Sequence, residues 1–475
     1  MVTKERERSP ASRPKAHGTR TRQPEPSGAT TEERWAAGKA LREKVPRVAH
    51  AVWEPPADRR DPVEVLKEAE RGLLPELLPI RHSRMQKSLF GFFRGAAALM
   101  TADLAGTPIT GLRVQACGDC HVANFGAYAS PERRLVFDIN DFDETLPAPW
   151  EWDVKRLAAS IVIDGSELGA REREGRAAAR AMVTSYRGHV REYARMDTLE
   201  VWYSSLDAGI LVTAAADHKD KKRWEAIEDA ARSRTPEQMF PKITDMKDGE
   251  PRIIDNPPLV YHSKNSRGGK EYAVDMFHRY RQTLPDERRM ILDRYRLVDV
   301  ARKVVGVGSV GTRCDVILLL ARTADPLFLQ FKEARASVLE PYAGKSRFAN
   351  QGERVVTGQR MLQAASDVFL GWTHNDEGLQ GYFRQYRDMK TKVDFAALPW
   401  SDWIEYVRVC GWALARAHAR TGDPAALAGY LGKSDAFDRA IEEFAVAYAE
   451  QNERDYQEFV KAIKGGRIRA SAEAY

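Results

Sequence analysis

The sequence lacks the features of a membrane-spanning or secreted protein. No apolar run approaches the roughly 20 residues that a membrane helix needs, and the first residues, MVTKERERSP, are charged rather than apolar. We therefore expect no secretory signal, no membrane partner and a cytoplasmic location. Cysteine is scarce, with only Cys117, Cys120, Cys314 and Cys410 in 475 residues. In a cytoplasmic protein these thiols are expected to be reduced.

An excess of charge of one sign is confined to the start of the chain. Residues 1–24 hold seven Lys or Arg and two Glu, a charge of +5, which leaves +1 for the rest of a chain whose net charge is +6. A nucleic-acid partner is therefore not expected for the folded part. The basic tail could contact nucleic acid or acidic lipid, but its Pro, Ser, Thr and Arg content favours a solvated, disordered segment.

The composition, 43% hydrophobic and 30% charged, is that of a chain with a large core. Helical and strand-like periodicities predict a helix-rich α+β fold with two lobes, one of them a small antiparallel β lobe. We expect five parts: a disordered basic tail at 1–45, a catalytic-loop and metal-binding part at 46–165, a helical insertion or cap at 166–295, a β-rich nucleotide-binding lobe at 296–392, and C-terminal helices of the large lobe at 393–475.

A carboxylate and an amide share a loop between two strand-like segments, in the sequence Gly118-Asp-Cys-His-Val-Ala-Asn124. Phosphoryl transfer needs a carboxylate that orients the nucleophile and oxygen ligands for magnesium. Asp119 would be the catalytic base, and Asn124 would supply a neutral oxygen to Mg²⁺.

A second acidic group follows the next strand-like run. Asp138 lies near the end of this run, and Asp141 and Asp143 follow it closely in FDINDFDETLP. A carboxylate at this strand end would be the second magnesium ligand, Asp141 in the first place, with Asp138 or Asp143 assisting.

These motifs resemble those of two enzyme families. Gly118-Asp-x-His-x-x-Asn124 followed by Asn140-Asp-Phe-Asp143 is similar to the catalytic and metal-binding motifs of aminoglycoside phosphotransferases and choline kinases, in the protein-kinase-like superfamily. In that superfamily a later aspartate braces the fold about a dozen residues after the metal ligand. Asp153 lies twelve residues after Asp141, which favours Asp141 as the ligand and leaves Asp138 as the alternative. Cys117 replaces the first histidine of the family's His-Gly-Asp.

The whole chain also resembles a bacterial family known only as a domain of unknown function. The resemblance rests on RMQKSLFGFFRGAAALM, GDCHVANFG and FDINDFDETLP. It implies no activity.

A glycine-rich turn, with Gly306, Gly308, Ser309 and Gly311 in the pattern GxGxxG, predicts a phosphate-covering loop. In a dinucleotide-binding fold such glycines open a helix. Here an apolar strand-like run, 314–320, follows them instead. Strand, glycine turn and strand is the order in a kinase phosphate loop.

The next strand-like run delivers Lys332, at the position of a lysine that pairs with the α- and β-phosphates of ATP. An exposed strand lysine is the plainer interpretation. Its expected acidic partner is Glu353, with Glu340 as the second choice. Because the catalytic set precedes the glycine loop, the chain would be a circular permutation of the kinase fold, with helix 406–420 or helix 85–104 under the catalytic loop.

Other interpretations of the same residues stay open. Cys117-x-x-Cys120-His121 also fits a haem-attachment pattern, and the thiols could contribute to a zinc site, but neither has supporting ligands in the sequence. His121 is favoured as a brace of the loop. Arg84 and Arg94 either contact a phosphate or anionic substrate or brace the structure.

The expected function is ATP- and Mg²⁺-dependent phosphoryl transfer to a hydroxyl of an unidentified small molecule or protein. Nucleotidyl (AMP) transfer on the same scaffold and a non-catalytic nucleotide-sensing or partner-binding pseudokinase are the alternatives.

Overall fold

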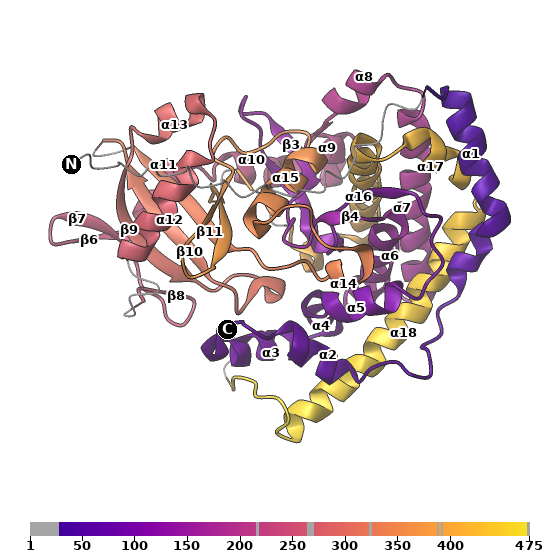
Figure 1. The fold of residues 1–475 in the computed structure, drawn as a ribbon, viewed down its shortest axis with the longest axis horizontal. Helices are drawn as coiled ribbons and strands as arrows, with labels where there is room; N and C mark the ends of the chain where they lie inside the picture. Colours follow the sequence, from indigo (N-terminus) through magenta and orange to yellow (C-terminus); the bar gives the residue numbers. More distant parts are fainter. Residues whose placement is uncertain are drawn as a thin grey trace, which may run out of the picture.

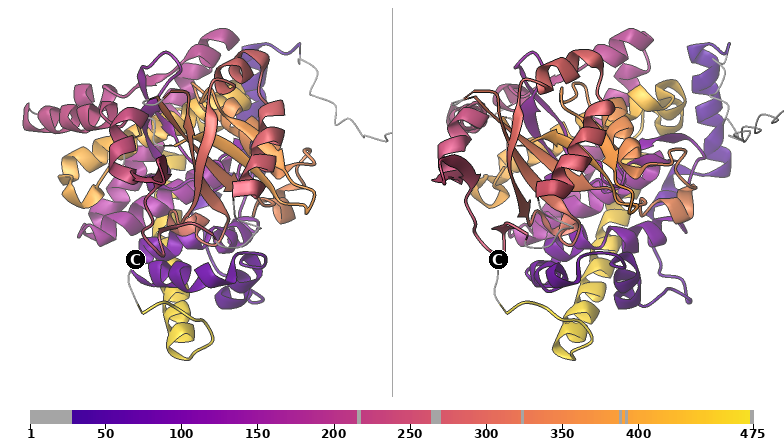
Figure 2. Two further views of the ribbon diagram at one scale, coloured as in Figure 1. Left: turned by 90° about the vertical axis from the view of Figure 1, so that its left-hand side faces the viewer. Right: turned by 60° about the vertical axis from the view of Figure 1, so that its left-hand side comes forward.

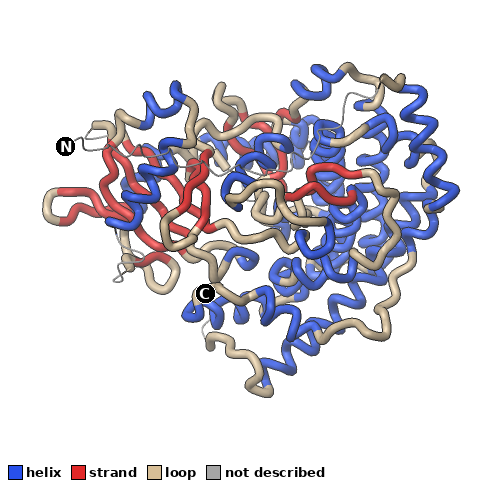
Figure 3. The backbone as a smooth tube through the Cα atoms, in the orientation of Figure 1, coloured by secondary structure: helices blue, strands red, loops and turns tan. Residues whose placement is uncertain are grey.

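The chain forms a β-rich lobe and a larger helical lobe, which lie side by side (Figure 1). The computed structural model describes residues 28–214, 218–263, 270–322, 325–386, 389–390 and 393–472. Strands gather toward one end of the molecule and helices toward the other (Figure 3). A two-stranded and a three-stranded sheet pack against the helices of the larger lobe. The predicted α+β class with a small antiparallel lobe is confirmed. Among the described helices, none is both long and apolar enough to cross a bilayer.

The β-rich lobe is built on one six-stranded antiparallel sheet. Its strands, in spatial order, are β12 (Gly371–His374), β13 (Gln380–Gln385), β11 (Pro326–Glu333), β10 (Cys314–Leu320), β9 (Arg296–Lys303) and β8 (Val260–Tyr261). Every residue of β10, CDVILLL, is buried. A continuous apolar run of this length indicates a central strand covered on both faces.

Helices on both faces of the sheet explain this burial. On one face Ile317 packs with Tyr280 of α12 (Lys270–Gln282). On the other, Leu318 shares a cluster with Phe240 of α11 (Pro236–Ile243). Residues 270–282 were expected to belong to an insertion or cap, which is wrong for this helix, because its apolar side chains form part of the core of the sheet lobe.

Four long helices form the centre of the helical lobe: α6 (Trp150–Glu167), α7 (Glu172–Tyr193), α16 (Trp400–Thr421) and α18 (Ala436–Lys464). The rings of Trp150 and Tyr186 stack at 6.0 Å between α6 and α7. Helix α7 is therefore a core helix rather than part of a cap. Helix α18 runs along this lobe and projects past it (Figures 1 and 2).

The boundary of the expected N-terminal tail also needs correction. Residues 1–27 lie outside the described part of the chain, but α1 (Thr31–Lys44) is a helix that begins with a Thr30–Glu33 capping box. It packs on α17 (Pro424–Leu431), where the Arg42 Nε–H donates to the carbonyl of Tyr430 at 2.8 Å. Gly38 and Gly429 lack a Cβ, which allows the two backbones to approach closely.

Shorter elements connect these parts. Helices α2 (Pro62–Ala69), α3 (Leu78–Gln86), α4 (Leu89–Gly95) and α5 (Ala97–Leu104) follow α1, and α4 and α5 cover most of the helix predicted at 85–104. The others are β1 (Arg113–Ala116), β2 (Phe125–Ala129), β3 (Leu135–Ile139), β4 (Leu146–Pro149), α8 (Thr198–Tyr203), β5 (Leu206–Asp207), α9 (Ile210–Ala214), α10 (His218–Arg232), β6 (Thr244–Lys247), β7 (Glu250–Ile253), α13 (Asp286–Leu292), α14 (Glu340–Ala343) and α15 (Gln351–Leu362).

Two glycine-to-alanine variants test the docking of α1. A Cβ at Gly38 would overlap the carbonyl oxygen of Ala426, so Gly38→Ala should lower the free energy of unfolding by about 1–3 kcal/mol. Gly188 of α7 has no atom within 4 Å of the same position, so Gly188→Ala should raise it by about 0.5–1 kcal/mol. Urea denaturation measures both. Equal stability of Gly38→Ala and wild type would contradict the close packing of α1.

Candidate functional site

The loop 117–124 joins β1 to β2 and is held from below by α6. Asp153, in the first turn of α6, accepts the backbone N–H groups of Cys117 at 2.7 Å and Gly118 at 3.0 Å. Gly118 has a φ of +85°, and a Cβ there would lie 2.5 Å from the carbonyl oxygen of Glu144. This position therefore requires glycine. The bracing role that the resemblance implied for Asp153 agrees with these contacts.

Asp119 presents one of its carboxylate oxygens to a buried arginine. Arg156 of α6 donates from Nε at 2.8 Å and from Nη2 at 2.5 Å to Asp119 Oδ1. The side chain of Arg156 is 2% exposed, whereas that of Asp119 is 21% exposed. The ion pair fixes the orientation of the carboxylate, and Asp119 lines the cavity described below.

Asn124 is oriented by the same loop. Its Nδ2 donates to the backbone carbonyl of Asp119 at 2.7 Å. Because the amide nitrogen is used in this way, Oδ1 is the atom of Asn124 that is left to act as a ligand. Helix α16 contributes from below, where the Tyr406 hydroxyl donates to the carbonyls of Val122 and Phe125. The predicted packing of a C-terminal helix under this loop is confirmed.

His121 is buried against the Phe90 ring, at a centroid distance of 5.8 Å. Burial, followed by the positive charges of Arg94 and Arg156, lowers the pKa of His121 well below its usual value. The imidazole is therefore neutral near pH 7, as fits a packed brace of the loop better than a proton donor.

The lysine of the sheet lobe meets the acidic turn of the helical lobe. Lys332 Nζ, on β11, lies 2.5 Å from Asp143 Oδ2 and 3.5 Å from Asp141 Oδ1. The Tyr382 hydroxyl donates to Asp143 Oδ1 at 2.7 Å, and the Ser309 hydroxyl donates to Oδ2 at 3.3 Å. The structure therefore brings together the two groups of predicted residues that lie nearly 200 residues apart in the sequence.

The electrostatics of Asp141 differ from those of an isolated buried carboxyl. Burial alone would raise its pKa, but the charges of Lys332 and Arg384 lower the pKa to about 2. Asp141 is thus ionised at neutral pH. The ionised carboxylate of Asp141 and the neutral amide oxygen of Asn124 belong to residues that line the same cavity, and both are ligand types suited to Mg²⁺.

Asp138, the alternative ligand, has another role. It is fully buried, and both its carboxylate oxygens accept from Arg416 Nη2, at 2.8 and 2.7 Å. The backbone N–H of Ala364 donates to it as well, at 2.9 Å. Asp138 does not line the cavity, because its side chain points into the core toward α16. Its assignment as a metal ligand is therefore corrected.

Glu353 does not pair with Lys332. In the described ranges the carboxylates within 4 Å of Lys332 belong to Asp141 and Asp143. The next residue, Arg354, is the one that α15 directs at the acidic turn, with hydrogen bonds to the carbonyls of Asp143 at 2.8 Å and Thr145 at 2.6 Å. Glu340, the second choice, accepts from Gln351 instead.

The glycine-rich segment is the turn between antiparallel strands β9 and β10, as predicted. Arg81 of α3 donates to the carbonyls of Val307 and Gly308, both at 2.9 Å. A Cβ at Gly308 would lie 3.8 Å from Asp119 Oδ2, so the tip of the turn approaches the predicted base. Sequence reasoning missed Arg81, because nothing in its own neighbourhood indicates a partner 226 residues away.

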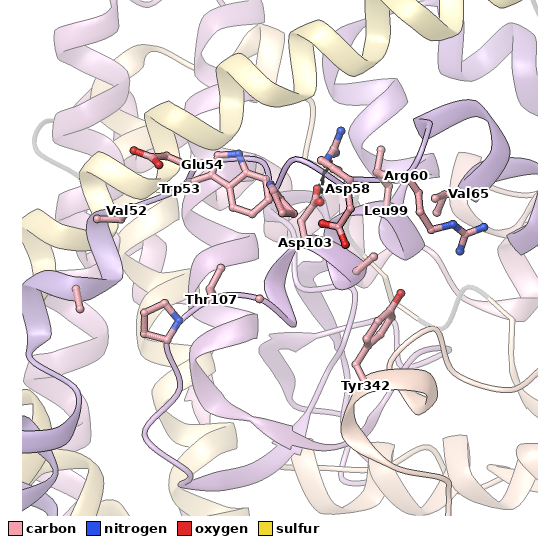
Figure 4. Close-up of a pocket in the computed structure, with 16 residues that line it drawn as sticks. Val52, Trp53, Glu54, Asp58, Arg60, Val65, Leu99, Asp103, Thr107 and Tyr342 are labelled. Atoms are coloured by element: carbon pink, nitrogen blue, oxygen red, sulfur yellow. Dashed lines mark hydrogen bonds and ion pairs between the residues drawn. The ribbon is translucent and has the colours of Figure 1, made fainter.

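One cavity of about 590 Å³ joins these parts. The cavity is lined by most of the residues that were predicted for the site: Asp119, Asn124, Asp141, Asp143, Gly306, Gly308, Ser309 and Lys332. Three arginines also line it: Arg81, Arg94 and Arg384. A second pocket of about 430 Å³, bordered by Trp53, Asp103 and Tyr342, lies beside it (Figure 4). The two share Arg60, Val65 and Tyr342 in their walls.

The cysteines of the loop are buried free thiols. Cys117, Cys120 and Asp153 offer ligand atoms within 4.8 Å of one another. Burial raises the pKa of Cys120 to about 11, and the Asp153 carboxylate already accepts two backbone N–H groups. This donor set does not fit a zinc site, which needs thiolates.

The chain belongs to a bacterial family. Residues 71–462 match the family described as "uncharacterized protein conserved in bacteria (DUF2252)". The matched segment contains every site residue that was predicted from the sequence. No curated protein and no solved structure matches the chain.

Replacement of Asp138 tests the correction of its role. Asp138→Asn leaves the buried guanidinium of Arg416 without its counter-charge, so the free energy of unfolding should fall by about 3–5 kcal/mol. Asp207→Asn is the matched control, because the side chain of Asp207 is 60% exposed and 3.8 Å from Arg134; its effect should stay within about 0.5 kcal/mol. Chemical denaturation measures both. A stable Asp138→Asn protein that has lost a magnesium effect would restore the ligand role.

Proposed function

We propose that the protein is an ATP- and Mg²⁺-dependent phosphotransferase of the protein-kinase-like type, with its sequence circularly permuted. The observation that carries the proposal is the contact of Lys332 with Asp141 and Asp143, at 3.5 and 2.5 Å. Phosphate-binding and magnesium-binding residues must share one site for phosphoryl transfer. This contact supports a single site formed by β11 and the turn after β3.

Each residue that lines the site has its own role in the proposed reaction. Asn124 Oδ1 and the Asp141 carboxylate would hold Mg²⁺, whose chemistry is to neutralise charge on the phosphate oxygens. Lys332 would bind the phosphates nearer the sugar, and the turn containing Gly306 and Gly308 would cover them. The second carboxylate, Asp143, positions Lys332.

Asp119 would orient the acceptor hydroxyl and take its proton. The acceptor oxygen forms a bond to the terminal phosphorus of ATP, and the bond from that phosphorus to the bridging oxygen breaks, with its electron pair leaving on ADP. Arg156 keeps Asp119 Oδ1 engaged at 2.5–2.8 Å, so Oδ2 is the oxygen for this task.

The neighbouring pocket of about 430 Å³ is the proposed position of the acceptor. It opens beside the cavity along Arg60, Val65 and Tyr342, which border both. A molecule in this pocket would have its hydroxyl directed into the cavity that Asp119 lines. The acceptor would enter without displacing the nucleotide.

Thermal-shift titration with Mg-ATP tests the proposed binding site. Millimolar Mg-ATP should raise the Tm of the wild type by several degrees, as about 100 Kd of ligand adds roughly 2.7 kcal/mol to stability. EDTA should remove most of the effect. Lys332→Met should remove most of it too, whereas Lys461→Met, at a lysine with a 78% exposed side chain, should not. A wild type unmoved by Mg-ATP would refute the proposal.

Transfer of labelled phosphorus tests the chemistry, with water as the acceptor. Release of γ-labelled phosphate should be slow in the wild type and about 100-fold slower or more in Asp119→Asn, which should still bind Mg-ATP. Asp207→Asn serves as the control. Incorporation of α-label into protein, with the γ-label released as pyrophosphate rather than as orthophosphate, would instead identify AMP transfer.

A further inference from the structure

Six basic side chains line the cavity of about 590 Å³, and five of them have protein partners. These five are Arg60, paired with Glu68; Arg81, on the glycine turn; Lys332, on Asp143; Arg335, on the carbonyl of Ala69; and Arg384, on Gln330. The sixth, Arg94 of α4, has no hydrogen bond or ion pair to any residue that the structure describes. Its buried Nε–H is among the unsatisfied donors.

Arg94 lies where the glycine turn approaches the predicted base. Its Nη2 is 3.5 Å from the position of a Cβ on Gly306. A Cβ on Gly308 would meet the carbonyl oxygen of Arg94 at 3.4 Å and Asp119 Oδ2 at 3.8 Å. The guanidinium thus borders the glycine turn inside the cavity, and its charge interacts with the carboxylate of Asp119 and, to a lesser extent, with that of Asp141.

An unpaired, largely buried guanidinium is costly to the fold. Desolvation of a charge is repaid only by a partner with good geometry, and the face of the Phe90 ring, 5.8 Å away, offsets a small part of this cost. Packing alone would be served better by an apolar side chain. The planar fork of arginine matches the oxygens of a phosphate group.

We infer that Arg94 binds the terminal phosphate of the nucleoside triphosphate and stabilises the phosphoryl group as it transfers to the acceptor. The inference rests on the proposed function. Lys332 and Arg94 then act at opposite ends of the phosphate chain: the lysine beside Asp141 and Asp143, and the arginine beside Asp119. Because charge spreads over the equatorial oxygens of the transferring group, a fixed guanidinium at that place favours transfer.

The distinction between a triphosphate and a diphosphate tests this role. Arg94→Met should weaken binding of the Mg²⁺ complex of β,γ-imido-ATP by about 10- to 100-fold, the value of a charged hydrogen-bonded contact, and Mg-ADP by less than about threefold. Arg94→Lys keeps the charge but loses the planar fork, so its affinity for the triphosphate analogue should lie between those of the wild type and Arg94→Met. Arg173→Met removes an exposed charge on α7 and should change neither affinity. Isothermal titration calorimetry measures all four proteins.

The Tm measured without nucleotide gives a second test. A ligand-binding role and a structural role of Arg94 predict changes of opposite sign in the Tm of Arg94→Met. Arg94→Met should raise the Tm by about 1–3 °C, because it removes an unpaired buried charge. Arg81→Met should lower the Tm, because Arg81 holds the carbonyls of Val307, Gly308 and Gly95. A fall in the Tm of Arg94→Met would identify a structural arginine and overturn the inference.

The failures of the two proposals look different. If the wild type binds neither nucleotide, the proposed function fails and this inference fails with it. If the wild type binds both, and Arg94→Met weakens both equally or neither, the inference alone is overturned. A loss of affinity confined to the triphosphate supports the inference. The turnover rate of Arg94→Met should then be about 1,000-fold below that of the wild type, as for other arginines that contact the transferring group.

Discussion

The ion pair of Lys332 with Asp143 is the contact on which the arrangement of the site depends. It joins the middle of the sheet to the turn after β3, across 189 positions of sequence. The side chain of Lys332 is 3% exposed and that of Asp143 is 27% exposed, so removal of Asp143 would take the nearest counter-charge from a buried ammonium. The hydroxyls of Tyr382 and Ser309 complete the hydrogen bonding of Asp143. The glycine turn and the acidic turn share one cavity because this cluster holds the two lobes together.

Four aspartates in the helical lobe have different roles, which depend on the groups that each one contacts. Asp138 is paired with Arg416, and Asp153 accepts hydrogen bonds from backbone N–H groups. Neither faces the cavity, so both serve the fold. Asp119 and Asp141 are also held by cations, Arg156 and Lys332 respectively, but each lines the cavity. Access to the cavity, rather than ionisation alone, separates the residues proposed for chemistry from those that maintain structure.

Sequence reasoning succeeded where the signal was local. The strand, glycine turn and strand at 296–320 follow from an apolar run next to glycines, and Lys332 lies on β11 as expected. It failed where the role of a residue depends on a partner far away in the sequence. The choice between Asp138 and Asp141 depends on Arg416, 278 positions away. Helix α1 was mistaken for part of a polar tail because its buried position is Gly38, and Trp35 and Leu41, which pack on the core, are only partly buried.

The same limit applies to the basic residues around the site. Arg81, Arg84 and Arg94 lie on one short stretch of helices, and their spacing offers no reason to separate them. In the structure Arg81 and Arg84 both donate to carbonyls of the segment 305–308, so their charges serve to shape the glycine turn. Arg94 has no hydrogen bond or ion pair to a residue that the structure describes: it borders the cavity while its Nε–H stays buried and unsatisfied. A largely buried guanidinium without a partner lowers the free energy of unfolding and holds no part of the described structure in place. A ligand-binding role is therefore the better explanation for Arg94.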